Sequence, residues 1–517
     1  MLNLSGPGHR LLRNWLLHPL KTTSAISARQ EAIEEIAGAR CAGDLHAGLR
    51  SVPDLERCLT RMAASSVGSG REREGVVLYE DVGKRRLRAF LATLRGFKKL
   101  RTLLERIGGE REWKAPLVSG ILASLDWTTL EDFEKEFDWS QADKDGKIIP
   151  SANFPSYREN LGKVDEVKSE LGDYLSQQRR AVRGVKWVSE QLEVPEKTDV
   201  PRNWELTSQR KGKQAVRRYQ TREVREILAT KTAAEEEVER TILEYLRSLI
   251  AKFCKHHEVW QRAVEAGAKL DVLCALSMVP DDWCRPKLIE AERGAFGAEG
   301  LSHPSGGCNF VPNDIHLGGA KSFALLTGPN MGGKSTVMRQ VCLATILAQI
   351  GARVPAISCE LTPVDAIFVR MGARDSILTG QSTWSTELLD CNSMLHQATS
   401  HSLVVLDEFG RGTTTSDGIA LAAAVMKWLV KRRCLALFST HYHLLAESVH
   451  QGGGGDDDNI LLCHMACEVD EKDQVTFLYK IRQGVCPSSY GVNVAALAGL
   501  PEKVLKRATE IISNQSK

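Results

Sequence analysis

The residues best suited to chemistry form a glycine-rich stretch at positions 328–335, with the sequence GPNMGGKS. It fits the phosphate-binding pattern G-x-x-x-x-G-K-[ST], in which backbone N–H groups at a helix N-terminus surround phosphate oxygens. The apolar run 323–326 before it predicts a short buried strand, and the proline-free segment 335–349 after it predicts a helix. In that context Lys334 would reach the outer phosphates of a nucleotide, and the Ser335 hydroxyl would ligate Mg²⁺.

Two adjacent carboxylates close the segment 402–408 (SLVVLDE), whose apolar run predicts a second buried strand. A nucleotide hydrolase needs one carboxylate for hydrated Mg²⁺ and one that orients or deprotonates the attacking water. The sequence therefore predicts that Asp407, together with Ser335, holds the metal ion and that Glu408 is catalytic.

A third apolar run, 435–439, predicts a buried strand that is followed by Thr440 and His441. Alone, such a histidine is more often structural. Beside the other two motifs, it can contact the γ-phosphate and position Glu408, so His441 is the second predicted catalytic residue.

A small polar turn at 378–383 precedes a helix expected to begin near Trp384. A helix N-terminus preceded by Ser or Thr is either an anion site or an ordinary helix cap. Because the stretch 328–335 already supplies an anion site, this turn would serve a nucleotide bound by another subunit, as in ABC-type ATPases.

Length and composition bound the class of protein. A chain of 517 residues, 43% hydrophobic and 26% charged, is typical of a globular protein with two to four domains. No apolar run approaches the ~20 residues of a membrane span, and the first residues lack the apolar core of a signal peptide. The 13 scattered cysteines suit a reducing compartment. With a net charge of only +3, nucleic-acid affinity must come from local basic patches.

Two basic patches stand out. Residues 84–101 carry eight Lys or Arg and no acid, in a region 1–155 that is expected to be mainly helical. We favour a solvated helix face there over a nucleic-acid contact. Residues 156–216 contain short strand-like pieces and basic turns, and the predicted DNA-binding residues are Arg210, Lys211 and Lys213. A merely solvated basic hairpin is the alternative.

The proline-free span 221–278 then predicts a helix, about 80 Å long if unbroken.

Four long motifs resemble those of the MutS family of DNA mismatch-repair ATPases, at 327–340, 407–418, 438–443 and 486–491. The segments around His464 and Phe477 make the chain most similar to the eukaryotic MutS homologue 6 type, the larger subunit of the base-mismatch recognition heterodimer. The similarity covers essentially the whole chain and is strongest from 309 to 501.

The resemblance implies a multidomain fold, with an α-helical core and lever, a small mixed clamp, an α/β ABC-type P-loop ATPase domain and a C-terminal helical dimerisation element. The expected regions are 1–155 (core and outgoing lever), 156–216 (DNA clamp), 217–280 (returning lever), 281–487 (ATPase) and 488–517 (dimerisation element).

The resemblance also implies ATP and Mg²⁺ as cofactors, and ATP hydrolysis coupled to DNA binding. Phe310 matches the position that stacks on adenine, and Ser382 matches the serine offered in trans to a partner's nucleotide. The expected nucleotide-binding residues are Phe310, Gly328, Pro329, Asn330, Met331, Gly332, Gly333, Lys334, Ser335 and Thr336. In the family, ATP converts a mismatch-bound dimer into a sliding clamp. The expected partners are mismatched double-stranded DNA, a MutS homologue 2 type subunit and MutL-type repair factors, in the nucleus and without a membrane.

Two departures from the family pattern leave alternatives open. Ser416 stands where an aromatic residue is usual, which admits a nucleotide-binding structural partner with little hydrolysis. The family's mismatch-reading Phe-x-Glu motif is not found, so the chain is either a fragment or acts without its own mismatch wedge. Family members without that domain act as clamps on recombination or meiotic DNA junctions, which is the other alternative.

Overall fold

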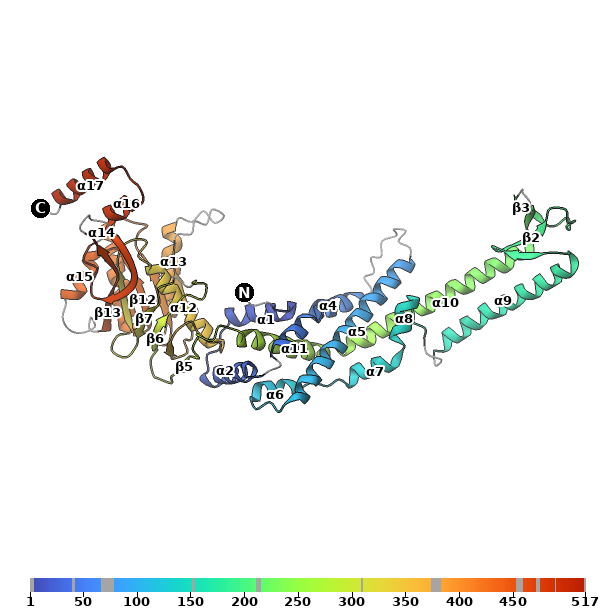
Figure 1. The fold of residues 1–517 in the computed structure, drawn as a ribbon, viewed down its shortest axis with the longest axis horizontal. Helices are drawn as coiled ribbons and strands as arrows, with labels where there is room; N and C mark the ends of the chain where they lie inside the picture. Colours follow the sequence, from blue (N-terminus) through green and yellow to red (C-terminus); the bar gives the residue numbers. More distant parts are fainter. Residues whose placement is uncertain are drawn as a thin grey trace. The chain divides into compact units, whose positions relative to one another are not determined.

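The computed structural model describes residues 4–39, 42–66, 79–150, 154–210, 215–307, 310–372, 383–451, 459–470, 475–488 and 490–515. The chain folds into two compact units, and its elements are shown in Figure 1. The first unit comprises Met1–Arg50, Ile107–Ala123 and Ala268–Lys517, and the second comprises Ser51–Arg106 and Ser124–Gly267. Helices dominate the first half of the chain and sheets appear in both units, as expected. The division into core, DNA clamp, returning lever, ATPase and dimerisation element stays a prediction.

The second unit is built around an aromatic core. Its helices are α4 (Leu55–Ser66), α5 (Tyr79–Glu110), α7 (Thr128–Glu136), α8 (Trp139–Asp145), α9 (Pro155–Ala181), α10 (Arg222–Lys255) and α11 (His257–Ser277), of which α5 and α11 extend past its bounds. Phe90 from α5 and Phe133 from α7 meet Phe253 from α10 with ring centroids 5.7 and 5.8 Å apart. All three rings are at most 1% exposed, so their burial holds the helices together.

The helical character predicted for 221–278 is confirmed, but the span is broken: one helix ends at Lys255 and a new one begins at His257. The indole Nε1 of Trp260 donates a 2.9 Å hydrogen bond to the Phe253 carbonyl, and the two rings stack with centroids 4.7 Å apart. Trp260 is 1% exposed. Burial of this large side chain therefore outweighs the local preference for a continuous helix.

A small antiparallel sheet joins α9 to α10, which lie side by side in Figure 1. Its strands are β1 (Lys186–Val188), β2 (Gln191–Pro195), β3 (Glu205–Arg210) and β4 (Val216–Gln220), in the order β1-β2-β4-β3. Its own core contains Leu192, Val194, Trp204 and Tyr219. The sheet therefore has a packed core of its own, and Arg210 lies at the end of its strand β3.

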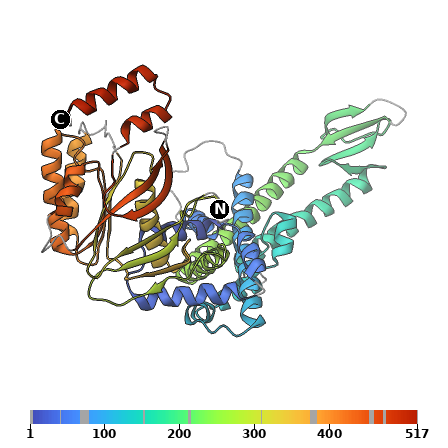
Figure 2. The ribbon, with the colours of Figure 1, turned by 60° about the vertical axis from the view of Figure 1, so that its left-hand side comes forward.

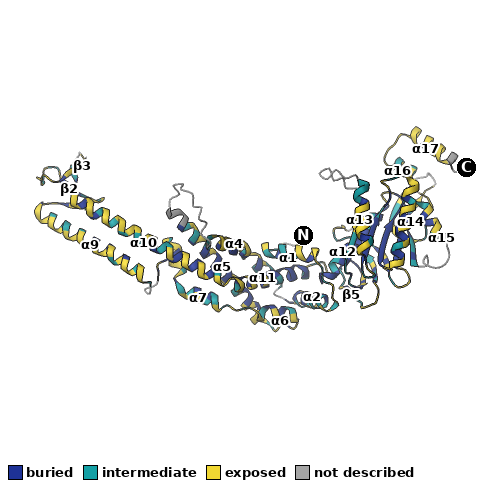
Figure 3. Ribbon diagram, turned by 180° about the vertical axis from the view of Figure 1, so that it is seen from behind, coloured by how far each residue is buried: buried dark blue, intermediate teal, exposed yellow. Residues whose placement is uncertain are grey.

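The first unit contains a six-stranded sheet in the order β10-β11-β12-β8-β13-β14. Figure 2 shows the sheets of this unit with helices beside them. The strands are β8 (Phe323–Thr327), β10 (Ile367–Arg370), β11 (Leu403–Asp407), β12 (Leu435–Ser439), β13 (Ile460–Val469) and β14 (Val475–Gln483). All neighbours are parallel except β13 and β14. Figure 3 colours the central strands as buried, which is why they are continuous apolar runs in the sequence.

Both faces of this sheet are covered. One face packs against α12 (Lys334–Gln349) and a second sheet, β5-β9-β6-β7, made of β5 (Lys287–Leu288), β6 (Phe296–Leu301), β7 (Asn313–Leu317) and β9 (Ser358–Leu361). The other face packs against α13 (Thr383–Gln397), α14 (Thr415–Arg432) and α15 (His443–Gln451). The strand and helix predicted around the stretch 328–335 are confirmed as β8 and α12.

The remaining helices of the first unit are α1 (Gly6–Leu17), α2 (Thr23–Ala37), α3 (Ala42–Arg50), α6 (Pro116–Ala123), α16 (Gly491–Leu497) and α17 (Glu502–Gln515). Gln349, at the end of α12, ties the α1–α2 connection to the sheet domain. Its Nε2 donates to the Leu20 carbonyl at 2.7 Å and to the Val364 carbonyl at 2.9 Å. In the described residues we find no helix with the length and apolar character that crossing a bilayer requires.

Candidate active site

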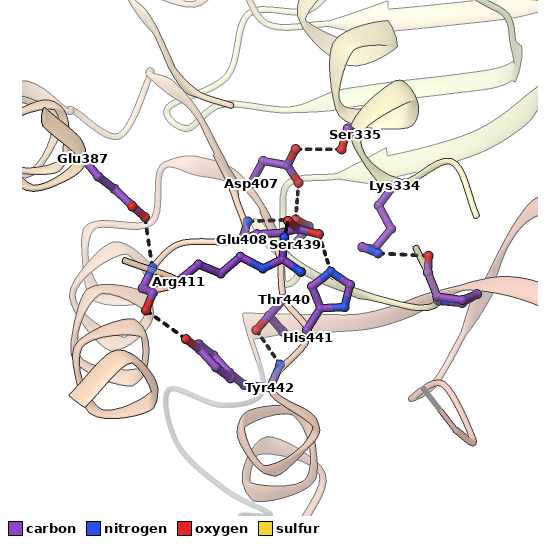
Figure 4. A network of polar contacts seen from close by, with 12 residues as sticks. Lys334, Ser335, Glu387, Asp407, Glu408, Arg411, Ser439, Thr440, His441 and Tyr442 are labelled. Carbon is purple, nitrogen blue, oxygen red and sulfur yellow. Dashed lines mark hydrogen bonds and ion pairs between the residues drawn. The ribbon is translucent and has the colours of Figure 1, made fainter. Parts of the chain in front are cut away.

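Three neighbouring parallel strands end at the same edge of the six-stranded sheet. In register, Asp407 at the end of β11 pairs with Ser439 at the end of β12, and Ser439 pairs with Leu326 of β8. Since the carboxyl ends of parallel strands share an edge, the three sequence motifs that follow them are brought together. Figure 4 shows the resulting polar cluster.

The stretch after β8 is a tight loop that leads into α12. Gly328 and Gly333 have φ angles of 132° and 100°, which non-glycine residues rarely adopt. A Cβ at Gly328 would also lie 3.2 Å from the backbone nitrogen of Met465 on β13. The loop therefore needs glycine for its backbone path and for its close approach to the neighbouring strand.

Lys334 points into this loop and is only 5% exposed. Its Nζ donates to the carbonyl oxygens of Gly328 at 2.8 Å and Pro329 at 3.1 Å. Burial lowers the pKa of this ammonium group, while the negative charges of Glu408 and Asp407 act in the opposite direction. The Lys334 ammonium group therefore lies where the backbone N–H groups of the loop would bind phosphate oxygens. When a nucleotide binds, this group can leave the two carbonyl oxygens and bind phosphate oxygens in their place.

The residues expected to hold the metal ion are in contact. The Ser335 hydroxyl donates a 2.6 Å hydrogen bond to Oδ2 of Asp407, and the Ser439 hydroxyl donates to the other carboxylate oxygen, Oδ1. A hydroxyl and a carboxylate oxygen at the start of a phosphate-binding helix form a donor set that suits Mg²⁺, which prefers oxygen ligands. The residues present therefore fit that ion.

Glu408 is held from several directions. Its backbone has a φ of 57°, and its N–H donates to the carbonyl oxygen and to the hydroxyl of Ser439, each at 3.1 Å. Its Oε1 is hydrogen-bonded to Nε2 of His441, and its Oε2 forms an ion pair with Arg411. The two predicted catalytic residues are therefore in direct contact, as expected from their positions at adjacent strand ends.

The charge of Glu408 is stabilised by its neighbours. Burial alone would raise the pKa of this carboxyl, but the hydrogen bond and electrostatic contact with His441, together with the positive charges of Arg411 and Lys334, outweigh it. The pKa therefore lies below its ordinary value. A carboxylate that stays ionised can accept a proton or a hydrogen bond from water.

A buried glycine, Gly410, lies two residues beyond Glu408. The N–H of Gly410 donates to Oε1 of Glu387 on α13 at 3.0 Å, and the Gly410 carbonyl accepts a 3.0 Å hydrogen bond from the Tyr442 hydroxyl. Sequence reasoning missed Glu387, Tyr442, Arg411 and Ser439 as site residues. Ser439 had a detectable signal, since it is a polar residue that ends a predicted buried strand.

Phe310 lies in the loop before β7, against the imidazole of His303 with ring centroids 6.3 Å apart. Asn313, which begins β7, donates from Nδ2 to the carbonyl of Tyr479 on β14 at 3.0 Å. The Tyr479 ring is 3.5 Å from the position of a Cβ at Gly333. This chain of contacts connects the Phe310 loop to the phosphate loop. The adenine-stacking role of Phe310 stays a prediction. Ser382 lies outside the described residues.

Arg210 is exposed at the end of β3, where it pairs in register with Val216 of β4. Lys211 and Lys213 lie outside the described residues, so the predicted DNA contact stays a prediction.

Several members of the other basic patch, 84–101, make ion pairs within their own unit. Arg95 pairs with Asp143 at 3.4 Å, Lys98 with Glu134 at 2.8 Å and Arg101 with Glu131 at 2.6 Å. These pairs connect α5 to α7 and α8, which favours a structural role for that face.

Comparisons with known proteins give two family matches and several curated relatives. Residues 4–277 match the family description MutS domain III, and residues 324–515 match MutS domain V. The DNA mismatch repair protein MSH6 of Arabidopsis thaliana is 41% identical over 98% of this chain and 40% of its own length. Human Msh6 is 36% identical over 97% of the chain and 40% of its own length. MutS of Thermotoga petrophila is 32% identical over 99% of the chain and 62% of its own length. The chain thus spans about 40% of the two eukaryotic relatives.

Proposed function

This chain belongs to the MutS family and is of the MSH6 type within it, and on that premise we propose that it is an ATP-hydrolysing subunit of a DNA mismatch-repair complex. The observation that carries the proposal is the convergence of Lys334, the Ser335–Asp407 pair and the Glu408–His441 pair at one sheet edge. Phosphate binding, metal binding and water activation need these groups together, and a nucleotide-binding protein without hydrolysis would not need the last pair.

Each residue of the site has a separate role in ATP binding and hydrolysis. Lys334 holds the outer phosphates of ATP, and the loop 328–333 surrounds the inner ones with backbone N–H groups. Glu408 orients the attacking water and accepts its proton, while His441 and Arg411 keep the Glu408 carboxylate charged and oriented. Mg²⁺, held by Ser335 and Asp407, would neutralise charge on the outer phosphates when bound.

The proposed partners follow from the family. A second MutS subunit, of the MutS homologue 2 type, would complete the nucleotide site with its own serine turn and receive Ser382 in return. Double-stranded DNA, mismatched in the repair complex, would contact the small sheet β1–β4 through Arg210, Lys211 and Lys213, and MutL-type factors would act downstream. The nucleus is the proposed location, in keeping with the eukaryotic relatives.

The proposal is tested by DNA retention. The chain and its MutS partner subunit are loaded on a circular and on a linear duplex of the same sequence, and ATP is added. A sliding clamp should leave the linear duplex through its free ends within minutes and stay on the circle. Equal loss from both duplexes, or no ATP turnover by the complex, would contradict the proposal.

A further inference from the structure

We propose that Glu387 is a positioning residue for hydrolysis, which holds the turn that carries Glu408 through the backbone N–H of Gly410. The inference rests on the proposed ATPase function and adds a residue to it. Glu387 is a carboxylate in the second turn of α13, and it is only 8% exposed. A carboxylate so deeply buried requires a specific partner, because desolvation of its charge is costly. Its partner is the Gly410 N–H, at 3.0 Å.

The turn from Glu408 to Gly410 needs external support. Glu408 has a φ angle of 57°, which a non-glycine residue keeps only where its surroundings fix it, whereas Gly410 reaches its φ of 96° through the freedom of glycine. The first end is held by Ser439, whose backbone and side-chain oxygens accept the Glu408 N–H. The second end is held by Glu387, which receives the Gly410 N–H, and by the Tyr442 hydroxyl, which donates to the Gly410 carbonyl. Figure 4 shows these contacts around one short turn.

Two further contacts attach α13 to the same turn. The rings of Trp384 and Phe409 lie with centroids 5.9 Å apart, and a Cβ at Gly412 would be 2.9 Å from the Trp384 side chain. The first turn of α13 therefore packs on the residues that follow Glu408, and its second turn supplies the hydrogen bond to them. A displacement of α13 along or across its axis must pull on Gly410, and through it on the Glu408 side chain.

Tyr442 connects the segment that carries His441 to Gly410 as well. It directly follows His441, whose imidazole contacts Glu408, and its hydroxyl donates to the carbonyl of Gly410, the residue whose N–H donates to Glu387. Gly410 is thus the common attachment of α13 and of the segment that carries His441. Because the orientation of a catalytic group matters at the scale of about 1 Å, loss of the Glu387 contact should lower the rate of hydrolysis more than the affinity for ATP.

The test compares two substitutions in the complex of the full chain with its MutS partner. Glu387→Met has a similar volume but no acceptor for the Gly410 N–H, whereas Glu387→Gln keeps an acceptor oxygen. We expect Glu387→Met to lower kcat for ATP by about 10- to 100-fold with KM changed less than about 3-fold, and Glu387→Gln to recover most of that loss.

Asp390→Asn is the matched control, because Asp390 lies on the same helix and pairs with Arg370 at 3.8 Å, away from the turn. It should leave kcat unchanged, and thermal unfolding of all three variants monitors folding. The inference is overturned if Glu387→Met hydrolyses ATP at the wild-type rate, or if Asp390→Asn loses as much kcat. If the wild-type complex shows no turnover, the proposed ATPase function fails, and the inference fails with it.

Discussion

The Ser335 hydroxyl donates a 2.6 Å hydrogen bond to the Asp407 carboxylate, across 72 positions of sequence. This contact joins the first residues of α12 to the end of β11, so the phosphate loop and the acidic strand end form one site. It follows from the order of the sheet, because β12 lies between β8 and β11 and its Ser439 bonds the same carboxylate.

Lys334→Ala should weaken ATP binding by at least about 10-fold, since it removes a charge-assisted contact to phosphate. The affinity of the complex for a fluorescent ATP analogue measures it. Lys321→Ala is the matched control, because Lys321 is also a lysine that donates to a carbonyl, that of Ile460 at 2.8 Å, but outside the loop. Equal affinities for the wild type and Lys334→Ala would exclude the proposed phosphate role.

Arg411→Gln should shift the pH dependence of hydrolysis. Arg411 helps to keep the pKa of Glu408 below its ordinary value of 4.5, so the wild type should keep its rate as pH falls until that lowered pKa is reached. Without the arginine, burial still raises the pKa, and the acidic limb of the kcat profile should move to higher pH. The charged carboxylate likewise contributes stability above its unfolded pKa, which is lost as pH falls through the folded pKa.

Lys431→Gln removes the same charge from the exposed end of α14 and serves as the control for this pH profile. An acidic limb that stays in place in Arg411→Gln, or that moves equally in Lys431→Gln, would show that the Glu408–Arg411 pair does not set the protonation of the site.

Much of the site could be predicted because its parts are local in sequence. The phosphate loop, the acids after β11 and His441 after β12 each follow an apolar run, and parallel strands place their ends together. The contacts of Glu387 and Arg411 could not be predicted in this way. Glu387 reaches the site from a helix 23 positions before Gly410, and only the packing of α13 on the sheet brings it there. The sequence pattern indicates which strands end in catalytic or binding residues, but it does not indicate how a helix that covers the sheet is rotated.

The break in the long helix has a similar origin. The span 221–278 has no proline, and its local sequence favours a helix throughout. The chain nevertheless breaks at His256, where Trp260 enters the aromatic core and its indole bonds the Phe253 carbonyl. Such a break depends on tertiary burial of one side chain, which helical periodicity does not encode.

Neutralising Arg210, Lys211 and Lys213 to Gln should weaken DNA binding to the same extent for all sequences. If each cation neutralises one phosphate, the slope of log K against log salt should fall by up to about 3. A control that replaces the exposed Lys135, Lys144 and Lys168 by Gln removes equal charge from the same unit. A salt slope that stays unchanged when Arg210, Lys211 and Lys213 are replaced would rule out the predicted DNA contact.

Gly418→Ala should destabilise the protein by about 1–3 kcal/mol. Although Gly418 is helical, its added Cβ would lie 2.5 Å from both the Gly410 carbonyl oxygen and the Tyr442 hydroxyl. Gly120→Ala on α6 is the contrasting variant, since its Cβ would meet no atom within 4 Å and should stabilise the helix by about 0.5–1 kcal/mol. Chemical denaturation measures both, and a neutral or stabilising Gly418→Ala would refute the close contact.

The most direct test of the ATPase assignment is single-turnover hydrolysis by the complex with Glu408→Gln in this chain. A catalysing carboxylate contributes typically 10²–10⁴-fold, so hydrolysis at this site should fall by about that factor. ATP should still bind with wild-type affinity, because Lys334 and the loop 328–333 are unchanged. Hydrolysis at the wild-type rate in this variant, with the partner's own site disabled, would contradict the assignment.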